Sequence, residues 1–305
     1  MSRILDGNLV RDQIKSECRP RIERLIKQAG RAPGLAVVLV GDNPASEVYV
    51  RNKTKTAEDV GIRSETITPE ADISTEDLLI LIRNLNHAPD IDGILVQLPL
   101  PSHIDSQRIL LAVSPEKDVD GFHPLNVGLL STGRPGLRPC TPNGVIQILR
   151  RYDIPIAGQN AVVIGRSDIV GKPMAMLLLH ENATVTVCHS RTRDLPGVCR
   201  TADILVAAIG RAAMVTADYI KPGAVVIDVG INKVDKKSEA ERIFDPSRLA
   251  DFERRGSLLV GDVHPGDVAR VSSAYTPVPG GVGPLTIAML MSNTIDSAER
   301  RTRVS

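Results

Sequence analysis

The sequence predicts an α/β protein of two domains, of which the second is a Rossmann-like, doubly wound parallel sheet. Two observations lead to this prediction. Short runs of mostly β-branched residues alternate with longer segments that suit helices, along a chain whose 305 residues are enough for about two domains. The runs are also apolar on both faces, which is typical of strands in a parallel sheet covered by helices on both sides. They lie at residues 35–40, 93–98, 161–164, 183–187, 204–208 and 224–227.

Helix-compatible segments fill the spaces between these runs. They lie at residues 8–29, 45–60, 74–86, 174–179 and 285–291. Ser74 begins the third of these segments and is suited to cap it. A turn-rich stretch at residues 131–136, followed by Pro139 and Pro142, indicates a domain boundary with two strong strands before it and four after it. Residues 232–257 are charged and irregular, and we expect them to form a solvated excursion.

Composition and charge argue against several classes of partner. The 37 basic and 36 acidic side chains nearly cancel and only 2% of residues are aromatic, so a nucleic-acid surface is not expected. No apolar run approaches the ~20 residues of a membrane span, and the polar N-terminus does not resemble a signal peptide. The four cysteines and six histidines are scattered without metal-ligand spacing. We therefore expect a cytoplasmic protein with reduced, mostly buried thiols, no bound metal and no membrane or nucleic-acid partner.

A glycine-bearing turn joins the predicted strand at 161–164 to the helix that follows. The stretch Gly165–Pro173 comes directly after the strand, and such a turn brings backbone N–H groups and the helix dipole to a pyrophosphate. Ser167 stands where the usual dinucleotide motif has its second glycine, so the pattern alone also fits an ordinary turn. Its place at the start of four evenly spaced strands favours a dinucleotide site.

The end of the following strand favours NADP over NAD as the dinucleotide. An NAD site generally places a carboxylate there to bind the ribose 2′-hydroxyl, whereas the first carboxylate in this chain, Asp194, comes several residues too late. Ser190 and Arg191 stand there instead and suit a 2′-phosphate, and Arg166 in the first loop can add a second cation. The alternative is that Arg191 and Arg193 are ordinary surface charges.

Several polar residues in the first half of the chain are poorly explained by folding alone. Gln97 lies inside an apolar run, near the carboxyl end of the strand, where ligands bind in parallel sheets. Tyr49 and Lys53 are four residues apart on a predicted helix and share one face. Asp118 and Asp120 surround a predicted turn. Each feature alone has an ordinary explanation, namely a satisfied buried amide, a solvent-facing pair and turn chemistry.

Taken together, these features resemble the bifunctional methylenetetrahydrofolate dehydrogenase/cyclohydrolase family over nearly the entire chain. The stretches that carry the resemblance are residues 49–53, 92–101, 115–122, 139–144, 165–173, 228–232 and 276–286. The resemblance implies NADP-dependent oxidation of 5,10-methylenetetrahydrofolate to the methenyl form, followed by hydrolysis to 10-formyltetrahydrofolate. It also implies that tetrahydrofolate derivatives are the substrates and that the protein is a homodimer.

The resemblance further implies roles for individual residues. Lys53 would be the central catalytic group, and Gln97 would hydrogen-bond it and help position it. Tyr49 would pack against the folate ring system, and Asp120 would bind the amino-pyrimidine edge of the pterin. The residues expected to contact NADP are Gly165, Arg166, Ser167, Ser190, Arg191 and Ile231. The residues expected near the folate are Pro279, Gly280 and Gly281.

The domain bounds also follow from the resemblance. Residues 1–138 and 275–305 would form the folate-binding catalytic domain, because the C-terminal helix returns to it, and residues 139–274 would form the NADP-binding domain. A catalytic cleft would lie between them. One alternative is a monofunctional dehydrogenase, but the presence of both Lys53 and Gln97 argues against it. Another is a non-catalytic NADP-binding sensor, and the complete folate-side motifs argue against that.

Overall fold

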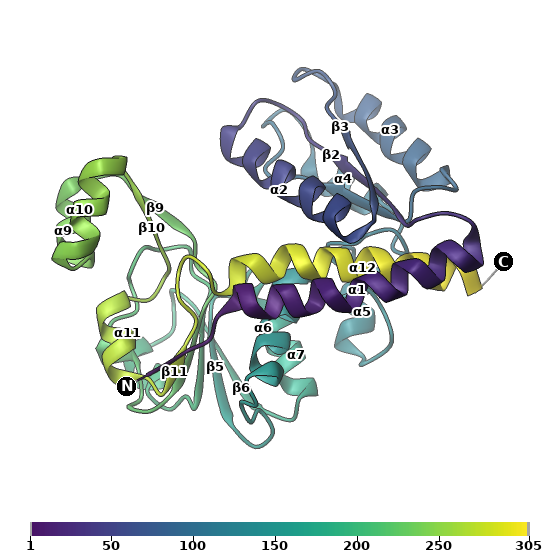
Figure 1. Ribbon diagram of the computed structural model, residues 1–305. Helices are drawn as coiled ribbons and strands as arrows, with labels where there is room; N and C mark the ends of the chain where they lie inside the picture. The colour runs from purple at the N-terminus through teal and green to yellow at the C-terminus, as the bar shows by residue number, and fades with distance from the viewer. Residues whose placement is uncertain (1, 304–305) are drawn as a thin grey trace. The chain divides into compact units, whose positions relative to one another are not determined.

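The computed structural model describes residues 2–303. The chain forms two compact units (Figure 1). The six-stranded unit contains the chain up to Arg11 together with Thr141–Thr286, and the three-stranded unit contains Asp12–Cys140 and the chain from Ile287 onward. Each unit is built on a parallel sheet with helices around it, so the predicted two-domain α/β fold is confirmed.

The three-stranded unit has a parallel sheet in the order β3–β2–β4. Its strands are β2 (Gly34–Val38), β3 (Arg63–Ile67) and β4 (Gly93–Val96). The apolar runs predicted from the sequence form β2 and β4, which are buried along their whole length. The sequence did not indicate β3, because this edge strand is largely exposed and mostly polar. Gln97 directly follows β4, which corrects its predicted place inside the strand.

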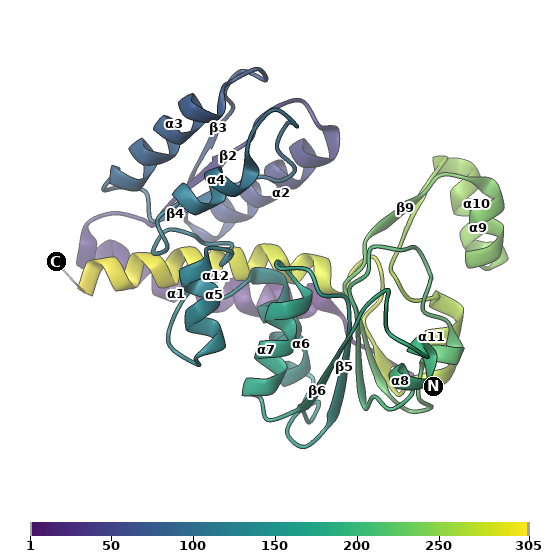
Figure 2. The ribbon, with the colours of Figure 1, turned by 180° about the vertical axis from the view of Figure 1, so that it is seen from behind.

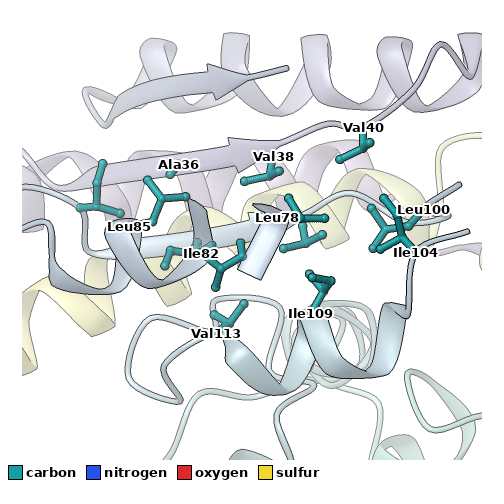
Figure 3. Packing of buried hydrophobic residues seen from close by; sticks show 13 residues of the cluster. Ala36, Val38, Val40, Leu78, Ile82, Leu85, Leu100, Ile104, Ile109 and Val113 are labelled. Atoms are coloured by element: carbon teal, nitrogen blue, oxygen red, sulfur yellow. The ribbon is translucent and has the colours of Figure 1, made fainter. Parts of the chain in front are cut away.

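Helices cover the three-stranded sheet, with α3 and α4 on one face. The helices are α1 (Gly7–Ala29), which begins in the other unit, α2 (Pro44–Val60), α3 (Thr75–His87), α4 (Ser106–Ala112) and α5 (Pro124–Ser131). Leu78 of α3 and Ile109 of α4 pack with Val38 of the central strand in one apolar cluster (Figure 3). Ser74 caps α3 as predicted, because its side chain accepts a hydrogen bond from Asp77 N.

The six-stranded unit has a parallel sheet in the order β1–β11–β8–β7–β5–β6. Its strands are β1 (Arg3–Ile4), β5 (Asn160–Ile164), β6 (Thr184–Cys188), β7 (Ile204–Ala207), β8 (Val225–Asp228) and β11 (Ala274–Tyr275). The four longer strands match the predicted runs. The chain passes from β5 to β6 on one side and then to β7 on the other, so the strand order reverses beside β5. Ligands of such sheets bind at the carboxyl ends of the strands, at this point of reversal.

Helices also flank the six-stranded sheet, and α7 packs against β5 and β6 (Figure 2). The helical elements are α6 (Cys140–Arg151), α7 (Gly171–His180), α8 (Leu195–Cys199), the 3-10 turn η1 (Ala217–Tyr219) and α11 (Pro265–Val271). Helix α12 (Val282–Arg303) begins in this unit and belongs from Ile287 onward to the three-stranded unit. The four cysteines are buried free thiols, as expected. No helix in the described part of the chain combines the length and the apolar character needed to cross a membrane.

Residues 232–257 are largely regular structure, which corrects the expectation of an irregular, solvated excursion. The elements of this region are β9 (Asn232–Val234), α9 (Lys237–Ile243), α10 (Pro246–Arg255) and β10 (Leu258–Val260), with β9 and β10 antiparallel. Phe244, Phe252 and Leu258 belong to an apolar cluster of their own there. The prediction was wrong because these apolar residues are too widely spaced among charged ones to give a periodic pattern.

The packing units differ from the expected domain bounds in two longer segments and at residues 139–140, which belong to the three-stranded unit. Residues 2–11 and 275–286 belong to the six-stranded unit. The reason is that β1 pairs with β11, and that the Gly7 N–H donates to the Gly280 carbonyl oxygen at 2.8 Å. The functional domain bounds inferred from the resemblance stay a prediction.

Candidate active site

Lys53 and Gln97 meet although they are 44 residues apart in the chain. Lys53 lies on α2 and is only 9% exposed, and its Nζ donates to Oε1 of Gln97 at 2.9 Å. The Nε2 of Gln97 donates to the Leu98 carbonyl oxygen at 2.7 Å, which holds the amide with its oxygen toward the ammonium group. The structure thus brings together the two residues that the sequence analysis pairs in one role.

Tyr49 lies one turn before Lys53 on α2, at the spacing that places two side chains on one face of a helix. The Asn43 side chain accepts a hydrogen bond from Ser46 N at 3.2 Å and so caps the start of this helix. Tyr49 is 44% exposed, so much of its ring is accessible to a ligand.

Asp120 lies in a turn whose backbone is fixed by its neighbours. Gly121 has a φ of +75°, and a Cβ on it would lie 2.5 Å from the Arg138 carbonyl carbon, so only glycine fits there. The Nδ2 of Asn293 on α12 donates to the carbonyl oxygens of Val119 at 2.7 Å and Arg138 at 2.8 Å. These contacts set the position of Asp120 without using its carboxyl group.

The Asp120 carboxyl group has a strongly raised pKa. The pKa is raised from 3.8 to about 6: loss of hydration is the main cause, attraction to the Lys53 ammonium group opposes it in part, and repulsion from Asp118 adds to it. Burial also raises the pKa of Asp118, against the hydrogen bonds that its carboxyl group accepts from His123 N and the Asn126 amide. A carboxyl group that titrates near neutrality beside a buried lysine is typical of a functional site.

The turn after β5 runs close against a neighbouring loop. Gly165 has a φ of +123°, and a Cβ on it would lie 2.1 Å from the Ala208 carbonyl oxygen. A Cβ on Gly171, at the start of α7, would lie 2.3 Å from the Gly165 carbonyl oxygen. Both positions exclude a side chain. The two glycines therefore let the turn pack closely on the loop after β7 and lead directly into α7, whose N-terminus lies where the pyrophosphate of a dinucleotide binds in Rossmann-like sheets.

Ser167, in the place of the usual second glycine, uses its side chain locally. Its Oγ accepts hydrogen bonds from Val170 N and Gly171 N, both at 3.2 Å, and these bonds close the loop that leads into α7. A hydroxyl group that accepts still carries its own proton, so Ser167 can also donate to a phosphate oxygen. Arg166, the preceding residue, is exposed.

Ser190 and Arg191 lie in the turn after β6, and both are exposed. Asp194, the first carboxylate after the strand, has another task, because its side chain caps α8 by accepting a hydrogen bond from Gly197 N at 3.2 Å. A hydroxyl group and a guanidinium group are therefore presented at the end of this strand, and the sequence predicts both for a 2′-phosphate site.

The other predicted residues lie in two further loops of the six-stranded unit. Ile231 follows β8 and is 45% exposed. The loop of Pro279, Gly280 and Gly281 precedes α12; Gly280 has a φ of +103°, and a Cβ on Gly281 would lie 2.5 Å from the Pro277 carbonyl oxygen. By packing, this loop belongs to the six-stranded unit, whereas the expected domain bounds place it with the folate-binding residues.

Asp228 and Asp262 were not among the predicted site residues, although both are buried and accept several backbone hydrogen bonds. The pKa of Asp228 is raised to about 7, because burial raises it more than the backbone hydrogen bonds that its carboxyl group accepts lower it. The sequence does contain a signal, since each aspartate precedes a valine and stands within two residues of a glycine near a strand end. That signal cannot be told from turn chemistry without the fold.

The predicted residues thus form two sets. One set, in the three-stranded unit, pairs a buried lysine and amide with a titratable carboxyl group and an accessible ring. The other set consists of loops of the six-stranded unit, most of them at the carboxyl ends of its strands. Within residues 2–303, no group of three or more His, Cys, Asp or Glu side chains is arranged to hold a metal ion.

Two known protein families match the chain. Residues 5–120 match the family described as tetrahydrofolate dehydrogenase/cyclohydrolase, catalytic domain. Residues 139–302 match tetrahydrofolate dehydrogenase/cyclohydrolase, NAD(P)-binding domain. Among curated proteins, the bifunctional protein FolD of Solibacter usitatus is 65% identical over 306 residues, which cover all of both chains.

Solved structures of similar proteins superpose over almost the whole chain. The bifunctional FolD methylenetetrahydrofolate dehydrogenase/cyclohydrolase of Campylobacter jejuni has a TM-score of 0.89 at 45% identity, covering 99% of this chain and 100% of that one. The FolD methylenetetrahydrofolate dehydrogenase-cyclohydrolase of Trypanosoma brucei, solved in complex with NADP cofactor and an inhibitor, has a TM-score of 0.88 at 40% identity, covering 99% of each chain.

Proposed function

The chain belongs to the tetrahydrofolate dehydrogenase/cyclohydrolase family, and we propose how its own residues carry out the two reactions. It is a bifunctional enzyme that oxidises 5,10-methylenetetrahydrofolate to the 5,10-methenyl form with NADP and hydrolyses that product to 10-formyltetrahydrofolate. The observation that carries our assignment of residues is the hydrogen bond between the buried Lys53 and Gln97.

NADP fits the loops at the carboxyl ends of the six-stranded sheet. The Gly165 turn leads into the N-terminus of α7, where the helix dipole favours a pyrophosphate. Arg191 can pair with the 2′-phosphate, and Asp194, which would repel it, is engaged as the cap of α8. The residues that we assign to NADP are Gly165, Arg166, Ser167, Ser190, Arg191 and Ile231. When bound, NADP supplies the hydride acceptor.

We assign the orientation of the folate to Tyr49 and Asp120. The Asp120 carboxylate, on its fixed turn, can accept two N–H bonds from the amino-pyrimidine edge of the pterin, and the exposed Tyr49 ring offers a face for packing. We assign the backbone of Pro279, Gly280 and Gly281 to further contacts with the folate. Such orientation is the main requirement of the dehydrogenase step, because hydride transfer depends on alignment.

Lys53 serves the hydrolysis step. Water adds to the methenyl carbon and loses a proton, and the carbon–nitrogen bond that opens leaves a nitrogen that gains one, so this step needs a group that relays a proton. The Lys53 ammonium group has three N–H donors, of which one bonds Gln97 and orients the others. Because Lys53 is 9% exposed, bulk water competes little for those donors.

The Lys53→Met variant tests this assignment, with Lys55→Met, at an exposed position of the same helix, as the matched control. Hydrolysis of methenyltetrahydrofolate, followed by its absorbance, is expected to fall about 10²–10⁴-fold in Lys53→Met. Reduction of NADP should fall much less, and Lys55→Met should behave as wild type in both assays. If Lys53→Met hydrolyses the methenyl substrate as fast as wild type, the assignment is wrong.

We also propose that the protein is a cytoplasmic homodimer that acts on tetrahydrofolate derivatives and has no nucleic-acid partner. Four buried free thiols support a reducing compartment, and the net charge of +1 offers no strongly basic surface. Sedimentation velocity should give one species of twice the 32.9 kDa chain mass. A single species at the chain mass, at micromolar concentration, would contradict the dimer.

A further inference from the structure

We propose that Asp262 is a positioning residue for NADP, whose carboxylate fixes two loops at the border of the NADP site. The inference rests on the NADP site proposed above. Asp262 follows β10 and is 0% exposed, so it acts on a ligand only through the backbone that it holds. Four hydrogen bonds, one steric contact and a second buried aspartate support this role.

The Asp262 carboxylate gathers four donors from two separate segments of the chain. Its Oδ2 accepts from Ile209 N at 2.5 Å and from Gly210 N at 2.9 Å. Its Oδ1 accepts from Arg211 N at 2.8 Å and from the side-chain Nδ2 of Asn232 at 2.9 Å. Three successive N–H groups therefore turn inward to one carboxylate, and this fixes the path of their loop.

The two segments leave the sheet at its carboxyl edge, where the NADP site lies. Residues 208–211 follow β7, and a Cβ on Gly165 would lie 2.1 Å from the first carbonyl oxygen of this loop. The loop therefore borders the Gly165 turn, beside the strand where the order reverses. Residues 229–232, which include the exposed Ile231, follow β8. A Cβ on Gly230 would lie 2.3 Å from Asp262 Oδ1, so this backbone rests directly on the carboxylate.

Asp262 is itself held by the carboxyl group of Asp228. Asp228 accepts hydrogen bonds from Asp262 N and Val263 N at 2.9 Å each, and from Gly230 N at 3.0 Å. A Cβ on Gly261 would lie 1.8 Å from Asp228 Oδ2, so these segments are in direct contact. The Asp262 carboxylate is therefore fixed on a rigid support and transmits that rigidity to both loops.

Only a carboxylate can satisfy this arrangement. All four partners are donors, and an ionised carboxylate is a pure acceptor at both oxygens. An asparagine side chain would replace one oxygen with an NH₂ group, which would point a donor at two donors and lose two hydrogen bonds. The affected loop would then sample other paths, and NADP would have to order it on binding.

The test compares Asp262→Asn with Asp203→Asn, a matched control in the same unit. Asp203 also accepts a backbone hydrogen bond, from Asn160 N at 3.0 Å, but it lies at the amino end of the sheet, away from the NADP loops. We expect the Kd for NADP, measured by titration calorimetry, to rise at least about tenfold in Asp262→Asn. KM for NADP should rise in parallel while kcat changes little, because the loops act on binding. Asp203→Asn should bind NADP as wild type does.

A milder variant keeps the inference testable if Asp262→Asn does not fold. Asn232→Ala removes one of the four donors and should raise the Kd for NADP severalfold, with circular dichroism and the thermal midpoint reporting that the fold is kept. Folded Asp262→Asn that binds NADP as wild type overturns the inference, as does an equal loss in Asp203→Asn, which would mark a general destabilisation. If Asp262→Asn does not fold, an unchanged Kd in Asn232→Ala overturns it. Wild-type protein that neither binds nor reduces NADP would instead refute the proposed function.

Discussion

Asp120→Asn is expected to stabilise the folded protein at neutral pH while it weakens folate binding. The carboxyl group has a pKa of about 6 in the fold against an ordinary value of 3.8, mainly because it loses hydration. A shift of about two units, at about 1.4 kcal/mol for each, means that ionised Asp120 costs the fold about 3 kcal/mol. Asparagine has nearly the same shape and carries no such cost.

The pH dependence of this effect has a definite sign. The pKa of Asp120 is higher in the folded state than in the unfolded state. The protonated carboxyl group therefore contributes its full stability below pH 3.8, and this contribution is lost as the pH rises through 6. The stability difference between Asp120→Asn and wild type should therefore approach 3 kcal/mol at pH 7.5 and nearly vanish at pH 4. Shifts in groups that do not interact with Asp120 cancel, since both proteins share them; Lys53 and Asp118 interact with its charge and therefore contribute to the difference.

Urea denaturation at pH 7.5 and pH 4 measures this difference directly. Asp72→Asn, at an exposed position in the loop before α3, is the control and should change the free energy of unfolding by less than about 0.5 kcal/mol at either pH. Asp120→Asn that is less stable than wild type at pH 7.5, or a difference that does not depend on pH, would refute the reasoning. Binding of a folate substrate analogue should be weaker in the same variant, because an amide cannot accept two N–H bonds as the carboxylate does.

Two further substitutions probe the backbone around this site, and a third probes a separate buried carboxylate. Gly121→Ala forces a side chain into a φ of +75° and against Arg138, so we expect a loss of about 1–3 kcal/mol in urea denaturation and weaker folate binding. Asn293→Ala leaves two carbonyl groups without their amide donor and should lower the free energy of unfolding by about 1–3 kcal/mol; an unchanged urea midpoint would contradict this. Asp92→Asn weakens the pairing of a buried carboxylate with the partly exposed guanidinium groups of Arg31 and Arg301 and should cost about 1–3 kcal/mol, seen as a lower thermal midpoint.

The sequence was sufficient to predict the strands that are apolar along most of their length. Strands β2, β4 and β5 are apolar on both faces, and both faces are buried, so pattern and structure agree. The edge strand β3 and the structure of residues 232–257 were not predicted. An exposed strand consists largely of polar residues, and the apolar residues of a small cluster are widely spaced in the sequence. The bounds of the packing units could not be predicted either, since two-residue strands such as β1 have no sequence signature.

For the candidate site, the sequence likewise predicts which residues take part, but not which of them contact one another. Motifs in the sequence place the chain in its family and name Lys53, Gln97 and Asp120. The 2.9 Å contact between Lys53 and Gln97 joins residues 44 apart, and no local pattern encodes such a distance. The raised pKa of Asp120 likewise depends on how deeply the fold buries it.

Aspartates make the distinction clearest, because one residue type serves three purposes. Asp194 caps a helix, Asp120 stands beside a buried lysine, and Asp262 binds the backbone of two loops. Each has an unremarkable set of neighbours in the sequence. Burial and hydrogen-bond partners decide among the three uses, and those partners come from segments that only the folded chain brings within a few ångströms.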